Sequence, residues 1–321
     1  MNGPAVPRAS RRIRRRRRGR DGQPVVPEAE FTSYYGLPVL NTPTWEALDI
    51  AGYLYLGGLA GGSSLLAAGA ELTGRPVLAR RARLGAAGAI SLSLAALVHD
   101  LGRPARFLNM LRVFKPTSPM SVGSWLLSGY APLTMVAAAT DAVRRFRPVG
   151  VAATAGAAVL APAVATYTAV LIADTAVPSW HEGYRELPFV FAGSGASAAA
   201  GLALLTVPWA EAAPARRVAV LGAALELGSF RLQKRRMGLA AEPFELGGAR
   251  RLLRTAKALT AGGAALALLT GRVRDRRAAA VAGAALLAGS AALRFGVFRA
   301  GVASAEDPKY TVVPQRERLG R

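Results

Sequence analysis

The chain has 321 residues, of which 52% are hydrophobic and 19% are charged, and its formal net charge is +22. Its mean hydropathy of +0.26 is positive in spite of that charge, so apolar segments must alternate with arginine-rich connecting segments. This pattern is typical of a membrane protein and argues against an ordinary soluble fold. The absence of cysteine excludes disulfides and thiolate-held metal centres, and two histidines, His99 and His181, are too few for two bis-histidine haems. The composition therefore predicts an all-α integral membrane protein with no haem, iron–sulfur cluster or metal of its own.

The N-terminal segment, residues 1–30, contains nine arginines together with proline and glycine. Its lack of apolar periodicity predicts a disordered tail, and the lack of a 7–15 residue apolar stretch excludes an ordinary secretory signal peptide. Nucleic-acid binding is one interpretation of such a tail. We favour the other, a cytoplasmic retention signal beside a membrane domain. We expect a polytopic membrane domain over 31–304 and a C-terminal tail over 305–321.

Apolar blocks from Trp45 onward have the length of membrane spans, for which about 20 residues are needed. Five blocks are clear: they start near Ile50, Pro116, Pro148 and Leu187, with a shorter one at Leu84–Val98 that needs neighbours such as Ala79 or Leu101. Three weaker blocks are interrupted or trimmed by charged residues: Val218–Leu232, Ala258–Gly271 and Ala278–Phe298. We predict eight transmembrane helices, or seven if one weak block does not span.

Eight spans place both termini on one side of the membrane. That side also receives the loops Arg103–Lys115, Val177–Leu187 and Lys234–Arg254, and its basic residues include the arginines of the tail. By the positive-inside rule we expect cytoplasmic termini in the cell (plasma) membrane. In the first span, Gly57 with Gly61 and Gly58 with Gly62 give two GxxxG spacings, which we interpret as helix packing.

Polar residues open the first span. Glu46, Asp49 and Tyr53 recur at three and four residues and so share one helical face. An interfacial tryptophan belt and a carboxylate favoured by the helix dipole suffice to explain Trp45 and Glu46. Tyr53 lies about two turns deep, where a polar group is a functional candidate.

Further polar residues lie near the same membrane face. His99, Asp100 and Arg103 cluster at the end of the second span, where they could pass protons to a bound redox molecule or only cap the helix and form a surface ion pair. After the Ser118-Pro119 break, Ser121 is the expected N-cap of the next span. Tyr167 lies two turns before the end of the fourth span and could bond a quinone carbonyl or another helix. Glu226 and Arg231 could neutralise each other or a lipid headgroup, and we favour this structural role over a proton route.

Five segments, YYGLPVLNTPTWE, YLYLGGLAGGSSLL, HDLGRPARFLNML, KPTSPMSVGSW and SAEDPKYTVVPQ, carry a resemblance that runs from about Ser33 to Gln315. Together they resemble the NrfD/polysulfide-reductase membrane-subunit family, the quinone-reactive anchors of molybdopterin oxidoreductases. The resemblance implies eight transmembrane helices as two four-helix bundles, at about 45–178 and 187–304, without haem. It also implies menaquinone as the redox molecule, a ferredoxin-like iron–sulfur subunit and a molybdopterin catalytic subunit as partners.

The resemblance further implies the quinone ligands. In the polysulfide-reductase branch, a polar residue and a histidine near the start of the first helix and a tyrosine in the fourth hold the quinone. When the sequences are matched at GLAGG, Tyr53 occupies the histidine position, the polar position lies at or beside Asp49, and Tyr167 is similar to the fourth-helix tyrosine. Tyrosine does not titrate near neutral pH, so His99 or Asp49 would be the proton donor. We expect quinone binding by Asp49, Tyr53, His99 and Tyr167, and proton transfer by Glu46 and Asp100.

The expected function is electron exchange between menaquinone or menaquinol and the iron–sulfur subunit, with this chain as a non-catalytic subunit. The basic residues Arg103, Arg106, Arg112 and Lys115 are expected to dock that subunit, because electrons must arrive close to the candidate polar groups. The alternative is an ion-translocating or transporter-like subunit without redox chemistry of its own. A structural scaffold would need only the helices.

Overall fold

The computed structural model describes residues 39–43, 45–101 and 109–319, and the regular elements within these ranges are all helical. The Arg-rich tail predicted over 1–30 lies outside the described residues. In chain order the elements are α1 (Ala47–Leu72), α2 (Pro76–Asp100), α4 (Pro119–Val143), α5 (Arg147–Ala173), α6 (Pro178–His181), α7 (Leu187–Thr206), η1 (Trp209–Glu211), α8 (Ala213–Arg236), η2 (Gly238–Glu245), α9 (Gly247–Val273), α10 (Arg276–Glu306) and α11 (Lys309–Leu319).

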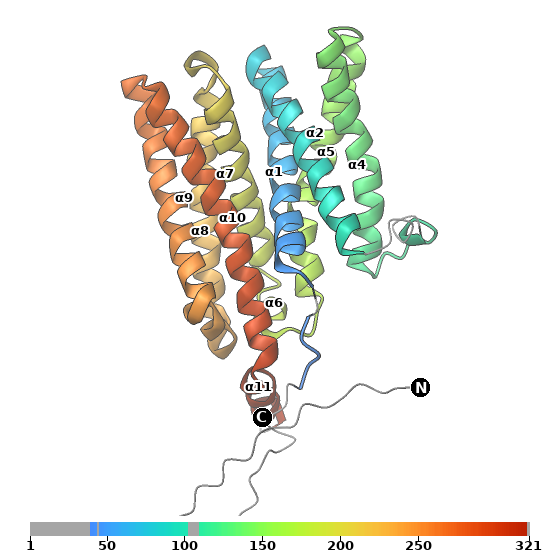
Figure 1. Cartoon of the computed structure of the whole chain (residues 1–321), viewed down its shortest axis with the longest axis vertical. Coiled ribbons are helices and arrows are strands. Elements are labelled where there is room, and N and C mark those ends of the chain that lie inside the picture. Colours follow the sequence, from blue (N-terminus) through green and yellow to red (C-terminus); the bar gives the residue numbers. More distant parts are fainter. Residues whose placement is uncertain (1–38, 44, 102–108, 320–321) are drawn as a thin grey trace, which may run out of the picture. The chain divides into compact units, whose positions relative to one another are not determined.

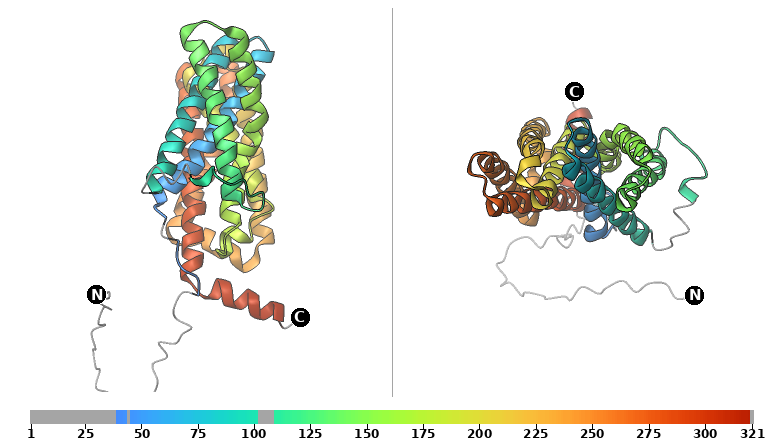
Figure 2. Two further views of the ribbon diagram at one scale, coloured as in Figure 1. Left: turned by 90° about the vertical axis from the view of Figure 1, so that its right-hand side faces the viewer. Right: turned by 90° about the horizontal axis from the view of Figure 1, so that it is seen from above.

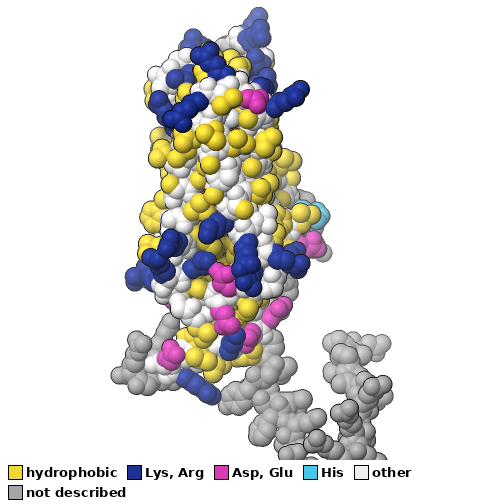
Figure 3. Space-filling model, turned by 90° about the vertical axis from the view of Figure 1, so that its left-hand side faces the viewer, with side chains coloured by type: hydrophobic (Ala, Val, Ile, Leu, Met, Phe, Trp, Pro, Cys, Tyr) yellow, Lys and Arg dark blue, Asp and Glu magenta, His cyan; other side chains and the backbone are white. Residues whose placement is uncertain are grey.

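Seven helices in the described part of the chain are long and apolar enough to cross a membrane, namely α1, α2, α4, α5, α7, α9 and α10. The helix α2 begins at Pro76, which supplies the length that the apolar block Leu84–Val98 lacks by itself. The remaining long helix, α8, has seven charged residues: Arg216, Arg217, Glu226, Arg231 and, in its last turn, Lys234, Arg235 and Arg236. Figure 3 shows a face on which hydrophobic side chains fill the middle and Lys and Arg gather toward the ends, so the fold is that of a multi-pass membrane protein.

The long helices pack side by side in two neighbouring sets, seen along their length in Figure 1 and from one end in Figure 2. In the first set, α1 and α4 each contact both α2 and α5. In the second set, α7 and α9 each contact both α8 and α10. The two sets meet where α1 contacts α7 and α10 and where α5 contacts α7.

Glycines allow the closest contact between the two sets. A Cβ atom added to Gly62 of α1 would lie 2.6 Å from the Gly195 carbonyl oxygen of α7, and one added to Gly195 would lie 2.6 Å from the Gly58 carbonyl oxygen. No larger residue fits at either position without moving a backbone. The packing role that the GxxxG spacing predicts is thereby confirmed at this crossing.

Candidate functional site

Two of the predicted quinone ligands, Tyr53 and Tyr167, lie in contact at one end of the first set. Tyr53 is six residues after the start of α1, and Tyr167 is six residues before the end of α5. At 1.5 Å per residue, each is about 9 Å from the end of its helix. Both side chains are buried, and their ring centroids are 6.3 Å apart in an edge-to-face arrangement. The structure therefore places the two tyrosines together at the same depth.

A cavity of about 250 Å³ lies beside these rings. Its walls come from the first turns of α1 and α4 and the last turns of α2 and α5. They are mostly apolar; besides the two tyrosines, the polar exceptions are Asp100, Ser118, Ser124, Asp174 and Thr175. The buried hydroxyl of Tyr167 has no hydrogen-bond partner within the described part of the chain. An unpartnered buried hydroxyl is costly, so a cavity beside it suits a ligand that brings a hydrogen-bond acceptor.

Gly123 of α4 makes room for Tyr167. A Cβ atom at this position would lie 2.6 Å from Cε2 of the Tyr167 ring. The glycine within KPTSPMSVGSW thus lets the ring pack closely against α4, a role that the sequence did not indicate.

The segment that leads into α4 corrects one prediction. Ser121 was the expected N-cap, but the helix begins at Pro119 and its N-cap is Ser118, whose hydroxyl accepts a hydrogen bond from the Ser121 N–H. Proline favours the first helical position because its missing N–H would be unpaired there in any case. Ser121 instead fixes the preceding segment: its hydroxyl accepts from the Lys115 N–H and donates to the Val113 carbonyl, both at 3.0 Å.

The other two predicted ligands, Asp49 and His99, form a pair with each other. The His99 Nδ1 atom lies 2.7 Å from Asp49 Oδ2 and so joins α2 to α1. His99 is 76% exposed, whereas Asp49 is 15% exposed. Neither residue lines the cavity, although each is next in sequence to a residue that does, Ile50 and Asp100. The four predicted ligands are thus two tyrosines at the cavity and a charged pair beside it.

Of the two residues predicted to transfer protons, Asp100 lies in the cavity wall, and Glu46 is the exposed N-cap residue of α1. Glu46, Asp49 and Asp100 all act electrostatically on the imidazole of His99. These four groups form one ionisable cluster between the cavity and the helix ends. An imidazole among carboxylates can take up and release protons near neutral pH.

An aromatic stack behind the cavity was not predicted. Trp45, which the sequence assigned to an interfacial belt, lines the cavity and stacks on Trp180 of α6 at a centroid distance of 6.0 Å. Trp180 is fully buried, donates its indole N–H to the Val297 carbonyl at 2.9 Å and contacts the Phe298 ring. The stack therefore connects the cavity wall to α10 of the second set.

Of the predicted docking residues, Arg112 and Lys115 are exposed in the segment before α4. Arg103 and Arg106 lie outside the described residues. The two described residues are on the cavity side of the first set, because they precede the start of α4, which lines the cavity.

A second buried polar region lies in the second set. Mutual neutralisation was one of the two interpretations of Glu226 and Arg231, but Arg231 is exposed. Glu226 of α8 is instead buried within electrostatic range of Arg294 of α10. Arg294 is 0% exposed, donates to the Phe191 carbonyl at 2.9 Å and lies over the Phe191 ring. Its Nε and Nη1 atoms and Glu226 Oε2 have no hydrogen-bond partner among the described residues.

Fold and cavity together define an all-helical, multi-pass membrane protein with a small apolar cavity at one end of its first four long helices. The family model described as polysulphide reductase, NrfD, matches residues 40–229, which is more than half of the chain. The chain belongs to the NrfD polysulphide reductase family, as its motifs predict. Members of this family are generally membrane subunits that partner iron–sulfur and molybdopterin subunits. The comparison with curated proteins returned no match.

Proposed function

We propose that this chain is the quinone-reactive membrane anchor of a molybdopterin-dependent oxidoreductase complex and exchanges electrons between menaquinone or menaquinol and an iron–sulfur subunit. The observation that carries the proposal is the unpartnered Tyr167 hydroxyl beside an apolar cavity. The matched family region includes the whole described wall of that cavity. A redox subunit needs such a site where a lipid-soluble carrier can enter from the membrane.

Each group at the cavity has a role that follows from its chemistry. A bound quinone supplies two-electron, two-proton redox chemistry. The Tyr167 hydroxyl would donate a hydrogen bond to a carbonyl oxygen of the ring, and Tyr53 would offer a second donor. Leu97 and Leu127 in the wall exclude water from the tyrosines. The His99 imidazole, held by Asp49 and exposed, would exchange protons with the solvent, with Glu46 and Asp100 beside it.

The same proposal includes eight transmembrane helices in two four-helix bundles, with α8 as the eighth span. This helix has 24 residues and contacts α7 and α9, and its one acidic residue, Glu226, is buried inside the protein. We propose that both termini are cytoplasmic. Alkaline phosphatase fused after Arg20 or Arg318 should then be inactive, and activity at one of these two fusions alone would contradict the even number of spans.

Partner docking is proposed for Arg112 and Lys115, together with Arg103 and Arg106. Their side of the first set is also the cavity side, so a cluster bound there would be near the tyrosines. Cross-links from a co-purified iron–sulfur subunit should reach Lys115. Cross-links confined to the opposite turns, at residues 73–75 and 144–146, would place the partner on the wrong face for this proposal.

The direct test measures electron transfer from quinol to the partner's iron–sulfur clusters. In the purified complex, a menaquinol analogue should reduce the iron–sulfur clusters of the partner, as measured by electron paramagnetic resonance. The double variant Tyr53→Phe/Tyr167→Phe should slow this reduction by roughly tenfold or more, because two buried hydrogen bonds are lost. Tyr130→Phe is the matched control, since Tyr130 is buried in the same set but bonds Ser64 and does not line the cavity. Equal reduction rates in all three proteins would refute the assignment.

A second candidate function, ion translocation without redox chemistry, rests on Glu226 and Arg294. Buried ionisable groups with unpartnered atoms at membrane depth are typical of ion or proton routes. This function predicts that Glu226→Gln abolishes proton uptake into reconstituted vesicles under an imposed ion gradient, and that the complex lacks menaquinol-dependent cluster reduction. Cluster reduction by menaquinol would remove this candidate.

A further inference from the structure

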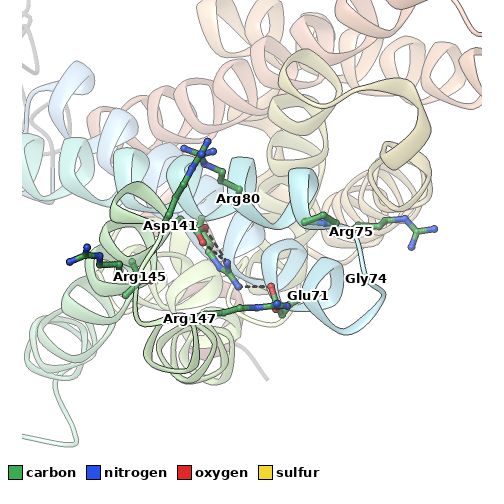
Figure 4. Close-up of a pocket in the computed structure, with 12 residues that line it drawn as sticks. Glu71, Gly74, Arg75, Arg80, Asp141, Arg145 and Arg147 are labelled. Atoms are coloured by element: carbon green, nitrogen blue, oxygen red, sulfur yellow. Dashed lines mark hydrogen bonds and ion pairs between the residues drawn. The ribbon is translucent and has the colours of Figure 1, made fainter.

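A second, larger cavity of about 550 Å³ lies at the other end of the first set, away from the tyrosines. It is formed where α1 ends and α2 begins and where α4 ends and α5 begins (Figure 4). Six arginines line it together with the carboxylates of Glu71 and Asp141: Arg75, Arg80, Arg83, Arg144, Arg145 and Arg147. Six positive and two negative charges leave the cavity with a net charge of +4.

Both carboxylates are already occupied by Arg83. This residue is 7% exposed, and its guanidinium donates to Glu71 at 2.7 Å and to Asp141 at 2.9 Å. Its Nε atom donates to the Thr154 hydroxyl at 2.7 Å, so the group is fully engaged. Arg147 is a second, longer partner of Glu71 at 3.4 Å. These contacts brace α1, α2, α4 and α5 against one another.

The other four arginines keep their charge uncompensated. Arg75, Arg80, Arg144 and Arg145 make no ion pair with any residue that the structure describes, although the cavity brings them together with Arg83 and Arg147. Like charges repel, and an anion bound among these arginines would reduce that repulsion.

The backbone of Arg144 adds to this argument. It ends α4 in the left-handed conformation, with φ at 53°. Glycine adopts this conformation without strain, whereas a residue with a side chain pays a cost there. A strained conformation at a site is a reason to look for a function of the side chain that is held in it. Here that side chain belongs to the basic cavity.

Exposed apolar residues lie next in sequence to residues that line the cavity, and we call these three neighbours the apolar rim. Leu72 at the end of α1 is 88% exposed, Val143 at the end of α4 is 60% exposed, and Phe146 in the following turn is 70% exposed. These residues lie at the ends of membrane-spanning helices, where lipid headgroups and the first acyl carbons are found. A ligand that combines a phosphate with acyl chains would cover both the arginines and this rim.

We propose that this cavity binds a phosphate-bearing anion, and that the anion is the headgroup of an acidic phospholipid. Guanidinium groups bind phosphate oxygens in a bidentate manner and are weakly hydrated, which suits a site at the membrane edge. The uncompensated arginines account for the preference for an anion. The apolar rim accounts for a lipid in preference to free phosphate.

The test uses the full-length chain, purified in detergent with any subunits that accompany it and then delipidated. Phosphatidylglycerol, phosphatidylcholine or inorganic phosphate is added, and binding and the melting temperature are measured. The test variants are Arg80→Gln/Arg145→Gln, which leaves the Arg83 brace intact, and Arg144→Gly. The control is Arg81→Gln/Arg277→Gln, which removes the same charge from exposed positions outside the cavity.

We expect phosphatidylglycerol to bind and to raise the melting temperature, with phosphatidylcholine and inorganic phosphate much weaker. Each lost arginine should weaken phosphatidylglycerol binding about fivefold, and the control should stay within twofold of the parent. Arg144→Gly should bind more weakly while melting at the same or a higher temperature, which a purely structural arginine would not do. Inorganic phosphate as effective as the lipid would overturn the lipid assignment, and test variants that bind like the control would overturn the site.

Discussion

The substitution Tyr167→Phe separates a ligand-binding role from a packing role. The Tyr167 hydroxyl is buried without a partner among the described residues, so its removal breaks no hydrogen bond within them. The variant should therefore melt at the same or a higher temperature, because a buried unpaired hydroxyl costs about 1–3 kcal/mol. A bound quinone would lose the bond that this hydroxyl donates. The same range of energy corresponds to a roughly 5- to 150-fold weaker affinity.

Tyr130→Phe should show the reverse pattern. Tyr130 is fully buried and bonds the Ser64 hydroxyl at 2.7 Å, away from the cavity. Its removal leaves Ser64 unpaired, so the melting temperature should fall while quinone affinity stays within twofold of the parent. Affinity for a short-chain menaquinone can be followed by quenching of tryptophan fluorescence, since Trp45 lines the cavity. A Tyr167→Phe variant that melts lower and binds normally would refute the reasoning.

Three further outcomes follow from the fold. Arg236 hydrogen-bonds both carboxylate oxygens of Glu186 and holds the pKa of Glu186 below the usual range. The stabilisation from this ion pair is complete above about pH 4.3 and is lost as the pH falls through the lowered pKa. The difference in melting temperature between Glu186→Gln and the parent should therefore shrink in acid. Gly195→Ala should lower stability by about 1–3 kcal/mol because its Cβ meets α1, whereas Gly69→Ala, with open space around it, should not. Arg83→Met should cost about 3 kcal/mol, since it leaves Asp141 unpaired and Glu71 with only the longer contact to Arg147; an unchanged melting curve would show that the brace is unimportant.

The predictions that the structure confirms rest on local patterns in the sequence. Apolar blocks of spanning length predict helices because each block must satisfy its own backbone in the membrane, and seven described helices meet that condition. The depths of Tyr53 and Tyr167 follow from counting residues along a helix. Their contact followed only from the family resemblance, because the sequence does not state which helices are neighbours.

Contacts between distant segments could not be predicted. Trp45 and Trp180 stack although 135 positions separate them, and Glu226 lies near Arg294 instead of its sequence neighbour Arg231. Charges inside a helix are ambiguous for the same reason. In α8 they interrupt an apolar block, yet the burial of Glu226 shows that some of this charge faces other helices.

The central claim is that the cavity between α1, α2, α4 and α5 is where quinone binds. A menaquinone with a photoreactive ring, irradiated in membranes that contain the full-length chain, tests it most directly when the labelled peptides are mapped by mass spectrometry. We predict labels around Trp45–Tyr53 and Tyr167–Thr175, removed by an excess of unmodified menaquinone. Labels that fall only on α7 to α10, or that excess menaquinone does not remove, would contradict the account.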